Sequence, residues 1–189
     1  SYPGLATAGT NHLQIDPPDG SEIAGLIRVL SADLNQPGST CYLSFLHRPE
    51  GEEEYSAVVL GSGNDPELSV GKSGSVRQYH ISQRGGRGRV YSGVEPVVGR
   101  TVFLVVKLEF RDGPDRFTLH VNPVPGAPEP AGGAVKDDLD LRFADGLTCI
   151  SADDGLYRAA DAAQLDALPE AAVDYCEPDY KLSLLDDPA

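Results

Sequence analysis

Short runs of β-branched and aromatic residues, each bounded by Gly, Pro or Asp, recur along this chain and constrain its fold more than any other feature. The clearest runs are residues 40–48 (TCYLSFLHR), 55–60 (YSAVVL), 100–110 (RTVFLVVKLEF) and 115–121 (DRFTLHV). Runs of this composition are typical of β-strands. Strands spaced by roughly ten residues, with no helical pattern between them, favour an antiparallel sandwich over a fold of alternating strands and helices.

Weaker runs extend this pattern over most of the chain. We predict further strands at residues 12–15, 22–30, 67–70, 76–82, 89–92, 139–143, 147–151 and 180–185. One short helix is predicted near the C-terminus, at residues 159–168 (AADAAQLDAL), because alanine and leucine favour helix and Pro169 ends it. No composition shift divides the chain, so we expect a single all-β domain over residues 1–189, with residues 170–189 as a tail that carries the last strand.

The two best strands are joined by the turn Arg111-Asp112-Gly113-Pro114-Asp115, and an Asp-Gly connection between alternating runs is a strong hairpin signal. In the first strand, alternation predicts a core-facing set and an opposite set of Phe103, Val105 and Lys107. The core-facing set is Val102, Leu104, Val106 and Leu108. In the second strand, Phe117, Leu119 and Val121 should face inward, and His120 should face outward or into a cleft.

Segments rich in Gly and Pro are interpreted as loops. Residues 122–138 (NPVPGAPEPAGGAVKDD) contain four prolines and three glycines, which favour a long surface loop over a hydrogen-bonded strand. Residues 61–63 and 71–74 are predicted to be hairpin turns, because the first glycine of a phosphate-binding loop is missing before Lys72.

The charge balance excludes some classes of partner. The chain has 15 Lys and Arg against 29 Asp and Glu, a net charge of −14, which repels nucleic acid. No apolar stretch is long enough to span a bilayer, so membrane insertion is not expected. The sequence contains no Met, and we therefore expect Ser1 to begin a processed product or an excised piece of a longer chain.

Four segments carry a resemblance to a known family: residues 1–9 (SYPGLATAG), 41–51 (CYLSFLHRPEG), 67–74 (ELSVGKSG) and 103–130 (FLVVKLEFRDGPDRFTLHVNPVPGAPEP). They resemble the concanavalin A-like, LamG-type jelly-roll domains of large secreted bacterial proteins. The last segment is the most specific, because it matches a V-V-x-x-x-F strand that leads through an acidic turn into T-L-x-V-N-P-x-P-G. The matching positions are Val105, Val106, Phe110, Thr118, Leu119, Val121, Asn122, Pro123, Pro125 and Gly126.

This resemblance covers residues 1–143 and implies a two-sheet antiparallel jelly-roll sandwich, export from the cell, and a binding or structural role rather than catalysis. The chain departs from the family at both ends. The usual closing strand, close to D-E-L-R-I-G, is replaced by DGLYRAADAAQ, which keeps only Leu156 and Arg158. The strand that usually precedes the SYPGLAT segment lies outside this chain.

Searches for catalytic patterns predict no catalytic residues. Related jelly rolls include glucanases, whose paired carboxylates alternate on one strand as in E-x-D-x-E, and no such run is present. The sequence has no G-x-S-x-G elbow, and His12, His47, His80 and His120 lack metal-binding spacing. We therefore predict that the chain is not an enzyme.

Two groups of residues are candidates for binding. Calcium is the one cofactor considered, and its candidate ligands are Asp137, Asp138 and Asp140, and separately Asp153 and Asp154. Ordinary surface acidic loops are the alternative for both groups. The basic residues Arg84, Arg87 and Arg89 form the one concentrated positive segment, which we expect either to bind an acidic surface of a neighbouring molecule or to be a flexible hairpin loop.

The cysteines and the tail lead to two linked predictions. We expect Cys149 to form a disulfide with Cys176, which would hold the tail near a core strand and leave Cys41 as a buried free thiol. The tail strand at residues 180–185, with Tyr180, Leu182 and Leu184 as its contacts, either closes its own sheet or adds to the sheet of a neighbouring molecule.

Together these features predict a non-catalytic secreted β-sandwich with a structural or adhesive role in a cell-surface or extracellular assembly. Its expected partners are further copies of itself or other extracellular proteins. The alternative is a carbohydrate-binding, lectin-like module, with or without calcium.

Overall fold

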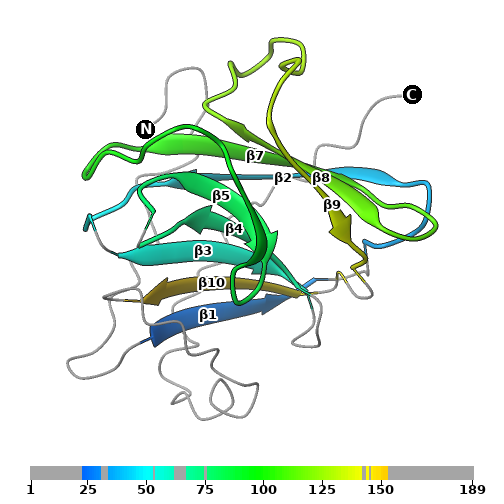
Figure 1. Ribbon diagram of the computed structural model, residues 1–189, viewed down its shortest axis with the longest axis horizontal. Helices are drawn as coiled ribbons and strands as arrows, with labels where there is room; N and C mark the ends of the chain where they lie inside the picture. The colour runs from blue at the N-terminus through cyan, green and yellow to red at the C-terminus, as the bar shows by residue number, and fades with distance from the viewer. Residues whose placement is uncertain are drawn as a thin grey trace.

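The computed structural model describes residues 23–30, 34–52, 54–61, 67–74, 76–141, 144 and 146–152 (Figure 1). These residues form ten strands: β1 (Ile23–Val29), β2 (Thr40–His47), β3 (Tyr55–Leu60), β4 (Leu68–Lys72), β5 (Tyr79–Gln83), β6 (Arg87–Tyr91), β7 (Val102–Glu109), β8 (Asp115–Val121), β9 (Ala134–Leu139) and β10 (Gly146–Ala152). The described part of the chain contains no helix, and hence none that could cross a membrane. The predicted helix at residues 159–168 lies outside the described residues.

The strands form two antiparallel sheets. Sheet A has six strands in the order β1-β10-β3-β4-β5-β6, and sheet B has four in the order β2-β7-β8-β9. The chain crosses between the sheets after β1, β2, β6 and β9, so strands distant in sequence become neighbours. The prediction of an all-β sandwich with two antiparallel sheets is confirmed.

The core lies between the sheets and follows the predicted alternation. Along β7 the core-facing residues alternate strictly with half-exposed ones, so Leu104, Val106 and Leu108 are fully buried. On β8, Phe117 and Leu119 are buried as expected, and the Phe117 ring makes an edge-to-face contact with Phe110 at 6.2 Å. Sequence alternation is a good guide here because both strands have one core face and one outer face.

The hairpin between β7 and β8 is held by Asp115, which is buried at the first position of β8. Its carboxylate accepts hydrogen bonds from the backbone N–H of Arg111 at 2.9 Å and of Leu141 at 2.8 Å. Burial raises the pKa of Asp115, while these two bonds oppose the rise. The residue therefore joins the hairpin turn to the end of β9.

Two loop predictions are wrong. Residues 122–138 do not form one loop, because β9 begins at Ala134 and pairs with β8, with Leu119 opposite Ala134 and Thr118 opposite Val135. Residues 71–74 are not a hairpin turn, because Gly71 and Lys72 belong to β4 and pair with both β3 and β5. Of the hairpin loop predicted at residues 84–89, residues 84–86 form the turn, in which Gly86 N–H donates to the carbonyl of Gln83, whereas residues 87–89 belong to β6.

The first and last described strands are neighbours in sheet A. β1 pairs with β10 over seven residues, from Ile23 opposite Ala152 to Val29 opposite Gly146. β1 is therefore one edge strand of the described sheet A, with β6 at the opposite edge, and the first residue of β1 lies beside the last residue of β10.

Candidate functional site

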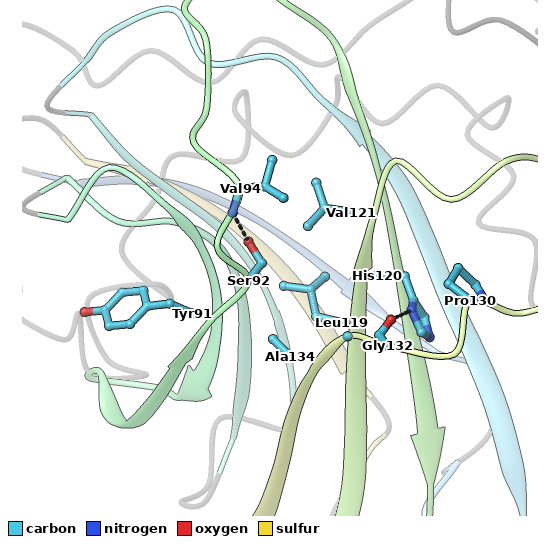
Figure 2. A pocket seen from close by; sticks show the side chains of 10 residues that line it. Tyr91, Ser92, Val94, Leu119, His120, Val121, Pro130, Gly132 and Ala134 are labelled. Atoms are coloured by element: carbon cyan, nitrogen blue, oxygen red, sulfur yellow. Dashed lines mark hydrogen bonds between the residues drawn. The ribbon is translucent and has the colours of Figure 1, made fainter.

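A cleft of about 270 Å3 lies where the edge of sheet A approaches β8 and β9. It is lined by Tyr91, Ser92, Val94, Leu119, His120, Val121, Pro130, Gly132, Gly133 and Ala134. Figure 2 shows Leu119 and Ala134 facing the side of Ser92 and Val94, while His120 turns the other way, toward Gly132. The lining contains no carboxylate, lysine or arginine and combines apolar with polar residues, so the cleft is amphipathic.

One wall of the cleft is formed by residues 129–133, which we call the strap. The connection from β8 to β9 extends beyond sheet B before it returns (Figure 1), and the strap is its last part. A Cβ added at Gly133 would lie 2.8 Å from the carbonyl oxygen of Leu119 and 2.8 Å from Cγ2 of Thr118. Glycine at this position therefore lets the strap lie close against β8.

Glu129 anchors the strap to the outer face of sheet B, the face turned away from sheet A. Its Oε2 accepts from Lys107 Nζ at 3.2 Å and from the hydroxyl of Tyr42 at 3.3 Å. Its Oε1 lies 3.3 Å from Nε2 of His120, whose Nδ1 lies 3.0 Å from the carbonyl oxygen of Gly132. Side chains of β2, β7 and β8 thus meet at the one carboxylate of the strap.

The electrostatics of this cluster favour an ionised Glu129. Burial acts to raise the pKa of Glu129, but Lys107 and His120 outweigh it, and the pKa is lowered overall. The hydrogen bond to Glu129 likewise raises the pKa of Lys107. The cluster therefore holds opposite charges at neutral pH, and its role in the fold is to fasten the strap.

A second polar network joins the two sheets. His47 of β2 contacts two residues of sheet A, with Nε2 at 2.7 Å from Ser56 Oγ and Nδ1 at 3.2 Å from the Tyr79 hydroxyl. Burial, and next the charge of Lys72, lower the pKa of His47 to about 4. The pair of Ser56 and His47 has the spacing of a nucleophile and its base, yet it lies within the sandwich, where Ser56 and Tyr79 are buried.

Lys72 is buried beside this network at the end of β4. Its Nζ donates to the backbone carbonyls of Glu52 at 2.7 Å and of Glu54. A buried ammonium group needs such acceptors, because an unsolvated charge is strongly unfavourable. Lys72 thus ties the connection between β2 and β3 to sheet A.

A third polar group lies on the face of sheet A opposite the core. His80 of β5 is fully buried between the rings of Tyr55 and Tyr91, each 6.4 Å away. Both ring nitrogens of His80 and the hydroxyl of Ser82 have no hydrogen-bond partner among the described residues. Burial, and next Arg89, lower the pKa of His80 to about 4.

The structure places only some of the predicted calcium ligands. Asp137 and Asp138 lie on β9 and Asp140 follows it, all three exposed, while Asp153 and Asp154 lie outside the described residues. The Asp138 carboxylate is bound by Lys136 Nζ at 2.6 Å, which lowers the pKa of Asp138. In the described ranges no three His, Cys, Asp or Glu side chains gather as a metal site would require. The calcium site remains a prediction.

The three arginines of the predicted interaction segment have different surroundings. Arg84 forms an ion pair with Glu67 at 2.6 Å, and both side chains are largely buried. Arg89 donates to Ser73 Oγ at 3.3 Å, whereas Arg87 is exposed at the start of β6. Nearby, the buried Lys136 reaches across from β9 and donates to the carbonyl of Gly88 at 2.9 Å. This contact covers part of the edge of sheet A.

The predicted disulfide and the predicted tail contacts involve residues outside the described part of the chain. Cys149 lies on β10, opposite Val58 of β3, and Cys176 lies outside the described residues. Tyr180, Leu182 and Leu184 also lie outside them. Cys41 is half-buried on β2 rather than fully buried.

Sequence reasoning missed the residues that make the site. Glu129 stands in a proline-rich segment, and its contact with Tyr42 spans 87 positions in sequence. Tyr79, Ser56 and Lys72 carried no motif, and they come close to His47 because sheet A packs against β2 of sheet B. For His120 alone there was a usable signal, since its outward position in a strongly alternating strand predicted a cleft or surface role.

Comparisons with known proteins assign no family to the chain. No family model matches it, and no curated protein matches it. It is similar to the crystal structure of an uncharacterized protein from Mycobacterium paratuberculosis, with 10% identical residues, 72% of each chain covered and a TM-score of 0.43. A likeness at this level names neither an activity nor a ligand.

Proposed function

We propose that this protein is a non-catalytic, secreted β-sandwich of the concanavalin A-like, LamG type, with a structural or adhesive role in a cell-surface or extracellular assembly. The observation that carries the proposal is a set of exposed apolar side chains at one end of sheet B, where β2 ends, β7 begins and β8 ends. These residues are Leu46, Val97, Val98 and Val124, with exposed fractions of 41%, 51%, 45% and 71%.

The contacts around these residues support a shared surface. Leu46 is the register partner of Phe103, whose carbonyl accepts from the N–H of Asn122, two residues before Val124. Gly99, next to Val98, donates to the carbonyl of Pro49, two residues after β2. These backbone contacts place the four residues at one end of sheet B, and an exposed apolar patch at such a place is typical of a surface that binds another protein.

The internal polar groups also support a structural role. His47 of sheet B binds Ser56 and Tyr79 of sheet A, and Glu129 holds the strap. In this proposal their chemistry serves the framework, and binding takes place on the outer surface.

The double variant Val98→Ser/Val124→Ser tests the proposal. We expect the wild-type protein to self-associate as its concentration rises, and more strongly in about 0.5 M salt, because salt screens repulsion between copies of charge −14. The double variant should remain monomeric at concentrations where the wild type associates, as measured by sedimentation velocity. Val29→Ser is the matched control, since Val29 is 78% exposed on β1 of the other sheet. A wild type that stays monomeric throughout, or a double variant that associates equally, would contradict self-association through this surface.

The alternative function is carbohydrate binding, and the amphipathic cleft favours it. Tyr91 stands at the rim with 39% of its surface exposed, and Ser92 and the backbone of the strap provide polar groups beside an apolar floor. Sugars combine an apolar ring face with hydroxyl groups, which suits such a lining.

A glycan array, with and without a chelator, tests this alternative. If the cleft binds sugar, we expect reproducible signals that fall at least tenfold in Tyr91→Ala, and the chelator arm reports whether calcium takes part. Val76→Ser is a suitable control, because Val76 is similarly exposed and does not line the cleft. The absence of any glycan signal would leave the structural role as the single proposal.

A further inference from the structure

The outer face of sheet A, which is turned away from sheet B, is buried although it lies outside the core. On β3, β4 and β5 it is formed by alternate residues: Tyr55, Ala57, Val59, Ser69, Gly71, His80 and Ser82. The Tyr55 hydroxyl lies 3.0 Å from Ser69 Oγ on this face. Tyr55, Ala57 and Val59 are buried but do not belong to the core cluster between the sheets. The burial of this face therefore needs a cover other than sheet B.

The centre of the outer face holds polar groups whose partners are missing from the described part of the chain. His80 and Ser82 are 0% and 1% exposed. Both ring nitrogens of His80 and the Ser82 hydroxyl have no hydrogen-bond partner among the described residues. Buried polar groups in folded proteins are almost always bonded, because an unsatisfied group loses its hydration without compensation. The cover must therefore bring hydrogen-bonding groups as well as apolar area.

The pKa of His80 indicates that the cover is uncharged where it meets the ring. Burial, and next the charge of Arg89, lower this pKa to about 4, and the backbone of Gln78 opposes them. A carboxylate beside the ring would favour the imidazolium and raise the pKa. On sheet A the ring is flanked by the neutral rings of Tyr55 and Tyr91. A segment without charged side chains therefore suits the centre of this face.

Residues 1–15 (SYPGLATAGTNHLQI) have the composition that such a cover requires. They contain no Asp, Glu, Lys or Arg, and no longer run without these residues occurs in the chain. Leu5 and Leu13 offer apolar area, while Asn11 and the backbone offer hydrogen-bonding groups. The other long segment outside the described residues, 153–189, contains ten Asp or Glu against two Lys or Arg. Packing that segment on a neutral, buried face would remove water from its charges, which is unfavourable.

Residues 1–15 can also reach the outer face. The chain enters sheet A at Ile23, the first residue of β1, and β5 lies four strands away in the order β1-β10-β3-β4-β5. Four strand spacings amount to about 19 Å. Residues 16–22 span up to about 23 Å when fully extended. Even the last residue of the uncharged run can therefore lie over His80, which leaves the rest of the run to extend over the face.

We propose that residues 1–15 lie across the outer face of sheet A, where they cover its apolar residues and provide the hydrogen-bonding partners of His80 and Ser82. The two-sheet sandwich then carries a third layer, contributed by the segment that precedes β1. Closing this face leaves the cleft and the apolar end of sheet B for partners. The inference does not depend on the proposed function, and either can fail without the other.

NMR of the unmodified full chain tests the proposal directly. At about pH 7 the ring protons of His80 should show nuclear Overhauser contacts to side-chain protons of residues 1–15, because protons a few ångströms apart produce such contacts. Contacts of the ring to residues 153–189, or contacts to residues of sheet A alone, would overturn the proposal.

Thiol labelling provides the test with variants. Ser82→Cys is nearly isosteric and places a thiol at the centre of the outer face, and peptide mapping by mass spectrometry reads its reaction with iodoacetamide. We expect the new thiol to react about a hundredfold more slowly in the folded protein than in urea. Adding Leu5→Asp/Leu13→Asp, which puts charges into the cover, should raise the folded-state rate about tenfold or more. Leu165→Asp/Leu168→Asp is the matched control in the other segment and should not change the rate.

Amide exchange of Leu104 and Val106 in β7 checks that the sandwich stays folded, and their protection should be equal in both double variants. The proposal is overturned if the new thiol reacts fast without further substitution, if Leu5→Asp/Leu13→Asp leaves it protected, or if the control pair releases it instead. Protection that disappears on dilution would assign the cover to a second copy and would also overturn it. Should Leu5→Asp/Leu13→Asp fail to fold, the contacts of the His80 ring in the unmodified chain decide.

Discussion

Lowering the pH from about 7 to about 4 is expected to destabilise the sandwich by about 3 kcal/mol for each of two histidines, His47 and His80. Both have a pKa of about 4 in the folded protein and an ordinary value of 6.5. Between these values the unfolded chain binds more protons than the folded one. The contribution of these two groups to the free energy of unfolding is therefore fully present above about pH 6.5. It falls as the pH decreases toward 4 and is lost below that value.

Urea unfolding at several pH values measures this loss, which should appear as a lower midpoint with an unchanged slope. In His47→Gln the amide can replace the hydrogen bonds to Ser56 and Tyr79 without titrating, so about half of the pH dependence should disappear. His120→Gln serves as a comparison, because the loss assigned to His47 and His80 should persist in it. Equal midpoints at pH 7 and pH 4.5 would contradict a neutral, buried state of the two rings.

Gly71→Ala is expected to destabilise the protein by about 3 kcal/mol or more, enough to prevent the accumulation of folded protein. A Cβ at Gly71 would overlap the carbonyl oxygen of Ser56 and lie 2.6 Å from Cα of Ala57. Both are backbone atoms of the neighbouring strand β3, which cannot turn away as a side chain can. The strands would have to separate in the middle of sheet A.

Gly132→Ala provides the control, because a Cβ at Gly132 would meet no atom within 4 Å. Its unfolding midpoint should lie within about 0.5 kcal/mol of the wild type, as for most surface substitutions. The comparison is made by urea unfolding and by the yield of soluble protein. If Gly71→Ala were as stable as Gly132→Ala, β3 and β4 could not approach as closely as the structure places them.

The sequence was most informative where apolar, core-facing residues recur at every second position of a strand. β7 and β8 were predicted nearly to the residue, because their apolar residues alternate and an Asp-Gly turn separates them. It was least informative where charged residues are buried. The composition around Lys72 predicted a turn. Lys72 instead lies inside sheet A, where its ammonium group binds two backbone carbonyls of the loop that precedes β3.

For the same reason, the sequence predicted neither β9 nor the contacts of the strap. The residues of β9 (AVKDDL) include three charged side chains, and they form a strand because β8 offers a pairing edge and Lys136 finds an acceptor on β6. The strap cluster depends on contacts between segments far apart in the chain. Local sequence patterns cannot report such contacts, which arise from the order of strands in the sheets.

The pairing of β1 with β10 has a mechanical consequence. Because Ile23 lies opposite Ala152, a force that pulls the two ends of the described sandwich apart acts across the strands rather than along them. The hydrogen bonds between β1 and β10 would then carry the load one pair at a time, as in the opening of a zipper. Strands sheared lengthwise share the load over all their bonds and resist more. A module built in this way withstands tension poorly through its ends, so any tension it bears is better transmitted through the faces of its sheets.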